Sequence, residues 1–191
     1  MNKFFIITLI GFFGFVNFSC ERNPIKGSTT EIISKHELFI QPLGKVNKRI
    51  VWLVDSIVQV VYGYNCVILP ETKPTRDIFA PSKTKIDGNK LLDKYTSTKH
   101  VLIITNIELS HFYSKDYPEW SIWGLGQQRG NAAVVSTYLL KSYDWGVVVK
   151  RVLLVSLHEI GNNLGLKNCR NKSCIMNSWQ DGVIKLDAVL N

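Results

Sequence analysis

The chain has 191 residues, of which 46% are hydrophobic and 11% aromatic. This length and composition exclude a disordered or collagen-like chain and allow one domain with a substantial core. The formal net charge is +8, but lysine and arginine are scattered, with no run of five or more. We therefore expect a solvated basic surface and no nucleic-acid partner.

The N-terminal residues have the pattern of an export signal. Lys3 precedes a mainly apolar stretch over residues 4–16, which is too short to cross a bilayer, where about 20 residues are needed. A small residue, Ser19, then precedes Cys20, and this pair resembles the bacterial lipobox. The resemblance implies a signal peptide over residues 1–19, lipidation of Cys20 and an exported lipoprotein that faces the periplasm or the cell surface. An uncleaved N-terminal anchor is the alternative.

The next residues predict a tether between this anchor and a folded domain. Residues 20–37 are polar and contain Pro24, Gly27 and a cluster of serine and threonine. Residues 38–191 contain no internal repeat and are expected to form one domain.

Apolar periodicity predicts strands that alternate with helices in this domain. We expect strands over 38–42, where Pro42 ends the run, and over 66–70, 101–105, 122–127 and 131–137. We expect helices over 46–61, 88–95 and 145–163, and a loop over 71–87. The last helix is apolar almost all round, which is typical of a helix buried in a domain. The pattern indicates an α/β (α+β) fold with a mixed, twisted sheet and a buried central helix.

The end of this buried helix carries the candidate chemistry. From His158 the sequence reads HEIGNNLGLKNC, which resembles the metzincin zinc signature H-E-x-x-H-x-x-G-x-x-H. His158, Glu159 and Gly165 are in place, whereas Asn162 and Asn168 stand where the second and third histidines belong. Residues four apart share one helix face, and a glycine allows the left-handed turn that follows.

The resemblance narrows to the archaemetzincins. Cys169 follows the third ligand position, and Cys174 and Met176 follow at the spacing of that family. The agreement extends over about residues 38–176, and it includes Pro42-Leu43-Gly44, Val101 to Asn106, Trp123 to Gly126 and Ala132 to Thr137. The resemblance implies a compact metzincin-like domain, a methionine turn at Met176, a zinc-dependent peptidase and a peptide or protein substrate along an edge strand. Residues 122–127 are the candidate edge.

The two asparagines decide what the resemblance implies for activity. Catalytic zinc takes three protein ligands, and an amide binds zinc poorly compared with imidazole. Among the remaining histidines, only His111 is a conceivable substitute ligand. We expect zinc to be lost or weakly bound. Glu159, the general base of an active enzyme, would then act on water with a pKa near 15.7 instead of about 7.

Three functions remain open at this stage. The leading hypothesis is an inactive scaffold that binds peptides or protein partners, either as an evolved binder or as an inactivated variant of an enzyme. The second is an active or weakly active zinc metallopeptidase in which His158, Glu159 and Asn162 hold the metal weakly. The third is a structural surface lipoprotein with an unused cleft.

The remaining cysteines and two tryptophans complete the predictions. Archaemetzincins carry a later C-x-x-C that completes a structural zinc site, and no cysteine follows Cys174 here, so that site is not expected. In an oxidising compartment Cys169 and Cys174 could instead form a disulfide. Cys66 is expected to be an unpaired core residue. Trp120 and Trp123 fit either ordinary packing or the lining of a cleft.

Overall fold

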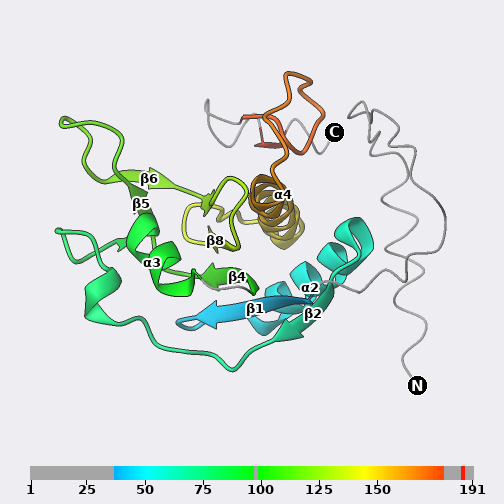
Figure 1. Cartoon of the computed structure of the whole chain (residues 1–191), viewed down its shortest axis with the longest axis horizontal. Helices are drawn as coiled ribbons and strands as arrows, with labels where there is room; N and C mark the ends of the chain where they lie inside the picture. Colours follow the sequence, from blue (N-terminus) through cyan, green and yellow to red (C-terminus); the bar gives the residue numbers. More distant parts are fainter. Residues whose placement is uncertain (1–36, 97–98, 179–185, 188–191) are drawn as a thin grey trace. The chain divides into compact units, whose positions relative to one another are not determined.

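The computed structural model describes residues 37–96, 99–178 and 186–187 (Figure 1). These residues divide into two compact units, one that ends at Lys167 and one that begins at Asn168. The predicted signal peptide, Cys20, residues 20–36 of the predicted tether and His36 lie outside the described residues. Within the described ranges, no helix combines the length and the apolar character needed to cross a membrane.

The larger unit alternates strands and helices as the sequence predicts. In chain order it contains β1 (Glu37–Leu43), α2 (Lys48–Tyr62), β2 (Asn65–Ile68), the 3-10 helix η1 (Arg76–Ile78), β3 (Ile86–Asp87), α3 (Gly88–Tyr95), β4 (His100–Thr105), β5 (Leu109–His111), β6 (Trp120–Ile122), β7 (Gly124–Gly126), β8 (Ala132–Ser136) and α4 (Trp145–Asn163). The helices predicted over 88–95 and 145–163 have the observed bounds, and α2 differs from its prediction by two residues at its start and one at its end.

Five strands form a mixed sheet in the order β2-β1-β4-β8-β7. The first four are parallel to one another, whereas β7 runs antiparallel to β8 at the end of the sheet. The remaining strands form a smaller sheet in the order β3-β5-β6, in which β6 is antiparallel to β5. The predicted mixed α/β fold is therefore confirmed.

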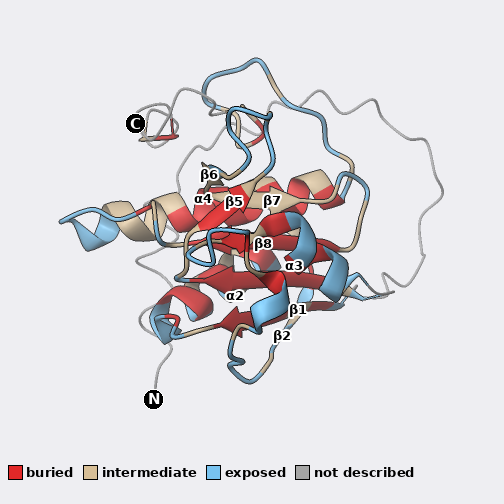
Figure 2. Cartoon of the chain, turned by 90° about the vertical axis from the view of Figure 1, so that its left-hand side faces the viewer, coloured by how far each residue is buried: buried red, intermediate tan, exposed pale blue. Residues whose placement is uncertain are grey.

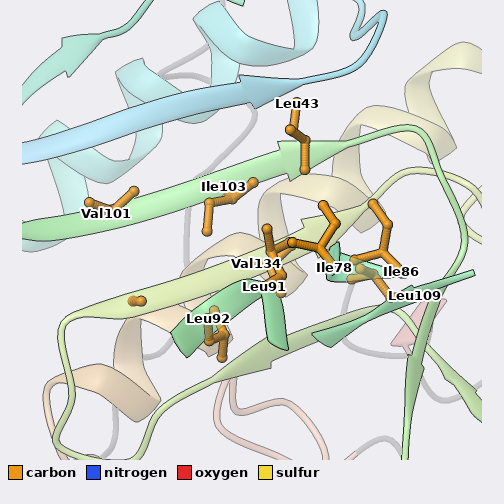
Figure 3. Close-up of a cluster of buried hydrophobic side chains, with 10 residues drawn as sticks. Leu43, Ile78, Ile86, Leu91, Leu92, Val101, Ile103, Leu109 and Val134 are labelled. Atoms are coloured by element: carbon orange, nitrogen blue, oxygen red, sulfur yellow. The ribbon is translucent and has the colours of Figure 1, made fainter. Parts of the chain in front are cut away.

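The core lies on both faces of the five-stranded sheet. Strands β4 and β8 are buried along nearly their whole length, which a parallel sheet needs helices on both sides to achieve (Figure 2). On one face of the sheet, α4 contacts β8, β7 and α2. On the other face, α3 contacts β8 and the smaller sheet (Figure 1 and Figure 2). The cluster on the α3 side joins side chains of β4 and β8 to those of α3, β3 and β5 (Figure 3), and its members include Val101, Ile103, Val134, Leu91, Leu92, Ile86 and Leu109. The buried α4 that the sequence predicts is confirmed.

The strand predicted over 66–70 begins at Asn65 and ends at Ile68, and two other predicted spans were wrong for reasons that the structure shows. Pro42 does not end β1, which continues to Leu43, because Pro42 and Leu43 stay paired with Ile104 and Thr105 of β4. On the other side of β1, the Pro42 carbonyl accepts a hydrogen bond from the Thr72 backbone N–H at 3.0 Å after β2 has ended. The predicted loop over 71–87 contains η1 and β3, because its polar sequence includes the buried apolar residues Ile78 and Ile86.

The predicted edge strand and the predicted core cysteine also need correction. Residues 122–127 are not one strand: β6 ends at Ile122 in the smaller sheet, and β7 begins at Gly124 in the larger one. Cys66 lies in β2, at the other end of the five-stranded sheet, and it is half-buried there rather than in the core. Burial and the neighbouring Asp55 carboxylate raise the pKa of its thiol to about 12.

Candidate functional site

Helix α4 delivers the signature residues to the candidate site. It begins at an N-cap, Asp144, whose carboxylate accepts a hydrogen bond from the Gly146 N–H at 2.7 Å. Its apolar sequence buries most of its length, and the signature residues His158, Glu159 and Asn162 occupy its last turns. His158 and Asn162 are both half-buried, whereas Glu159 is buried.

The Glu159 carboxyl is held inside the domain by two donors. Glu159 is only 8% exposed, and its Oε2 accepts a hydrogen bond from Asn162 Nδ2 at 3.0 Å. The backbone N–H of Gly126 in β7 also donates to this carboxylate. Burial raises the pKa of Glu159 to about 7, although both hydrogen bonds act in the opposite direction. The carboxyl is therefore close to half-protonated at neutral pH.

The edge strand β7 lies against this carboxyl because its glycines have no side chains. A Cβ atom on Gly126 would lie 2.5 Å from the Glu159 backbone oxygen. A Cβ atom on Gly124 would lie 2.8 Å from Glu159 Cγ and 2.9 Å from Val155 Cγ1. The sequence predicted an edge strand here but not its contact with Glu159. The signal that could have indicated this contact is the G-x-G spacing, because alternate residues of a strand face the same way and two glycines leave that face open to a close neighbour.

Helix α4 ends in a hydrogen-bonded left-handed turn at Gly165. The Gly165 N–H donates to the Asn162 carbonyl and the Leu166 N–H donates to the Gly161 carbonyl, both at 2.9 Å. This is the Schellman pattern, and Gly165 has the left-handed φ of +80° that it requires. A Cβ atom at Gly165 would also lie 2.9 Å from Arg129 Cγ, a contact that the sequence did not indicate.

The possible metal donors on α4 are one imidazole, one carboxyl and two amides, those of Asn162 and Asn163. Among the described residues, no group of three or more histidine, cysteine, aspartate or glutamate side chains is placed to hold a metal ion. His111, the conceivable substitute, lies in β5, where its Nδ1 is 3.2 Å from the Asn89 amide of α3. His100 packs against the Tyr64 ring, with ring centroids 5.6 Å apart.

The smaller unit contains the residues that follow the signature. The Cys169 N–H donates to the Met176 carbonyl at 2.7 Å, and the Asn177 N–H donates to the Cys174 carbonyl at 2.9 Å. Met176 is buried, and Asn168 is exposed. Cys169 and Cys174 are not joined to each other by a disulfide. The roles that the resemblance implies for Met176, Cys169, Cys174 and Asn168 stay predictions.

Comparisons with known proteins point to one family. The model of peptidase family M54 matches residues 50–188. Archaemetzincin from Archaeoglobus fulgidus is 28% identical over 148 residues, which are 76% of this chain and 88% of that protein. Archaemetzincin from Haloquadratum walsbyi is 37% identical over 149 residues, which are 72% of this chain and 83% of that protein. The crystal structure of the Archaeoglobus fulgidus protein, complexed with malonate, matches with a TM-score of 0.68 and 26% identity over 79% of this chain and 90% of that one.

Proposed function

The chain belongs to peptidase family M54, and from this premise we propose that it is a metallopeptidase scaffold with a degenerate zinc site, which binds a peptide or protein partner without cleaving it. One observation carries the proposal. Asn162 stands one helical turn after His158, and its amide donates to Glu159 at 3.0 Å. Asn162, which stands at the position of the second zinc ligand in the signature, is thus hydrogen-bonded to another residue of the same helix.

The side chains at the site do not fit a catalytic zinc ion. Such an ion takes three protein ligands, and zinc prefers imidazole, thiolate or carboxylate donors to a neutral amide. The only imidazole on α4 belongs to His158, and Asn162 directs its amide nitrogen to Glu159. Asn168, at the third signature position, has the same neutral amide. The family is zinc-dependent, so the poor fit between these side chains and zinc is a feature of this chain and not of the family.

Glu159 is a poor base for hydrolysis in this setting. Two donors, the Asn162 amide and the Gly126 N–H, already point at its carboxylate, and its residue is buried. Without a metal, attacking water keeps a pKa near 15.7, far above the pKa of about 7 of this carboxyl. Proton transfer from water to Glu159 is therefore strongly unfavourable. The proposal assigns the carboxyl a structural role instead.

The edge strand β7 is the proposed place of peptide binding. The Trp123 carbonyl and the Gln127 N–H are hydrogen-bonded to β8, so the backbone groups of Gly124 and Gly126 point away from β8. The Gly126 N–H is directed to Glu159, so an extended peptide would pair with the backbone of Gly124. Strand addition of this kind takes its affinity from main-chain hydrogen bonds. A randomised extended-peptide pool should shift the Gly124 amide resonance, and a chain without a peptide site would show no shift.

The proposal also includes export and a lipid anchor. Its support is the apolar N-terminal stretch and the Ser19-Cys20 pair, both of which lie in the sequence outside the described residues. The lipid on Cys20 would hold the domain at a bacterial membrane that faces the periplasm or the cell surface. No nucleic-acid partner is proposed, because the positive charges are scattered.

Zinc content is the decisive test of the proposed function. The chain is purified without metal, reconstituted with zinc and dialysed, and its zinc is measured by mass spectrometry. We expect no stoichiometric zinc in the unmodified chain and tight binding in the variant Asn162→His/Asn168→His. Either single replacement should gain little, because each still lacks one of three ligands. Adding His158→Ala to the double variant should abolish the gain, which controls for histidines that bind zinc without using the site.

Two results would contradict the proposal. Stoichiometric zinc in the unmodified chain, together with peptide cleavage that a chelator abolishes, would establish the competing hypothesis of an active metallopeptidase. A double variant that folds but binds no zinc would show that positions 158, 162 and 168 do not converge. The two asparagines could then not be the reason for the absence of zinc.

A further inference from the structure

A pocket opens beside the smaller sheet, away from the signature residues. Its volume is about 580 Å³, which is within the range of small-molecule sites. Its lining comes from the segment before β3, the end of the β5–β6 loop and the start of β6, and it includes Lys85, Asp116, Tyr117, Glu119 and Trp120. No lining residue belongs to α4 or β7. The pocket is therefore separate from the site of the proposed function.

Two aromatic rings form a right-angled corner in this pocket. The ring centroids of Tyr117 and Trp120 are 5.4 Å apart, and their planes meet at 88°. Both residues remain about half exposed, at 54% and 51%. The β5–β6 loop is held by backbone hydrogen bonds from the Tyr113 N–H to the Tyr117 carbonyl, at 3.2 Å, and from the Tyr117 N–H to the Ser114 carbonyl, at 3.1 Å. The Tyr113 ring also packs against Trp120, with ring centroids 5.9 Å apart and planes at 38°, and the half-exposed Trp120 ring is thus positioned before any ligand binds, which reduces the entropy cost of binding.

The charged groups around the corner are predominantly acidic. Asp116 and Glu119 line the pocket, and hydrogen bonds from Ser82 lower the pKa of Glu119, which keeps its carboxylate ionised. Lys85 is the lining cation, but its Nζ lies 3.3 Å from the Glu108 carboxylate, which offsets its charge. The charged lining residues are therefore two carboxylates and one cation, and both Lys85 and Lys90, which lies outside the lining, act on the Glu119 carboxylate.

Aromatic faces beside carboxylates are suited to a cation. The face of an indole or phenol ring carries negative charge density and attracts ammonium and guanidinium groups, most strongly in the case of tryptophan. We propose that this pocket binds an organic cation, a guanidinium or a methylated ammonium, whose apolar atoms lie on the Trp120 ring while Asp116 and Glu119 neutralise its charge. The cation could come from a basic side chain of a protein or from a free quaternary amine, and the probes below distinguish these sources.

The inference is tested by titrating the full-length chain with four small probes in sodium phosphate buffer. The probes are choline, N-acetylarginine amide, the neutral choline isostere 3,3-dimethylbutan-1-ol and methyl glucoside. Binding is followed by the indole N–H resonance of Trp120, which Trp120→Phe assigns by removing it. We expect choline or the arginine amide to saturate the resonance and to bind at least tenfold more tightly than both neutral probes. A stronger response to the arginine amide favours a basic side chain, and a stronger response to choline favours a quaternary amine.

Matched variants separate the two parts of the site, and their binding is followed by calorimetry. Trp120→Leu keeps an apolar side chain but removes the aromatic face, so choline affinity should fall by about twofold to thirtyfold. Trp120→Phe keeps a ring and should retain most of the affinity. Asp116→Asn/Glu119→Gln keeps the size of both side chains, and its loss of affinity should exceed that of Glu71→Gln, which removes an exposed carboxylate elsewhere. Equal binding of the neutral isostere, a preference for the glucoside, or no response to either cation would overturn the inference.

Discussion

Replacing Glu159 with glutamine should remove a pH-dependent loss of folding stability. The carboxyl has an ordinary pKa of 4.5, and burial raises the pKa to about 7 in the folded chain. The folded state therefore binds the proton more tightly than the unfolded state, and stability falls as the pH rises from 4.5 through 7. One pKa unit corresponds to about 1.36 kcal/mol, so ionisation of this group lowers the free energy of unfolding by about 3 kcal/mol.

Urea unfolding at a series of pH values measures this effect. The variant Glu159→Gln resembles the protonated carboxyl, since it is neutral and keeps an oxygen that accepts a hydrogen bond. We expect the free energies of unfolding of variant and parent to agree within about 1 kcal/mol at pH 4.5. At pH 8 the variant should be more stable by about 3 kcal/mol, which is the stability that the parent has lost. Glu71→Gln controls for the change in net charge, because Glu71 is exposed.

The sign of the difference is diagnostic. If the variant is less stable than the parent at pH 8, the ionised carboxylate is stabilised in the folded state, as it would be beside a bound metal ion. A difference that does not change with pH would show that Glu159 is not buried as the structure describes. Either result would refute the structural role assigned to this carboxyl.

Three further predictions test the packing, the edge cysteine and the anchor. Gly126→Ala should lower the free energy of unfolding by about 1–3 kcal/mol more than the control Gly63→Ala does. At Gly63 a side chain is disfavoured by the left-handed φ alone, whereas at Gly126 the new Cβ would lie 2.5 Å from the Glu159 backbone oxygen in α4. Cys66, with a pKa of about 12, should react with iodoacetamide at pH 8 at least about a hundredfold more slowly in the folded chain than in urea, and Asp55→Asn should speed the folded-state reaction. Cys20→Ser should abolish incorporation of a labelled fatty acid in bacterial cells, and unchanged labelling would contradict the proposed anchor.

The longer elements could be predicted because local signals define them. Asp87 precedes α3 and its carboxylate accepts from the Asn89 and Lys90 N–H groups, and Asp144 caps α4 in the same way. Gly63 ends α2 with a left-handed φ of +72°. The signals for β4 and β8 are their continuous apolar runs, which are typical of a parallel strand buried on both faces.

The smaller sheet could not be predicted, because its strands are too short to show a period. Strand β3 has two residues, and β5 and β6 have three each. Their positions are set by partners distant in sequence, as in the pairing of Leu109 with Ile122 and of Ile86 with Leu109. The contact between Gly126 and Glu159 is missed for the same reason, since it joins segments 33 residues apart whose approach depends on the whole sheet.

Asparagine in place of histidine at position 162 removes a metal ligand and also changes the hydrogen bonding of the neighbouring acid, Glu159. In the metzincin signature this position supplies a ligand, and the neighbouring glutamate accepts a proton from metal-bound water. In this chain the Asn162 amide donates to Glu159, and the Gly126 N–H donates to the same carboxylate, so the acid connects α4 to β7. A carboxylate can accept about four hydrogen bonds, so these two donors leave acceptor sites over, and it is the burial of Glu159 that limits the access of water to them. Histidine at position 162 would therefore restore a ligand and also remove one of these donors, whereas histidine at position 168 would leave the hydrogen bond between Asn162 and Glu159 intact. For this reason the proposed loss of hydrolysis is assigned first to Asn162.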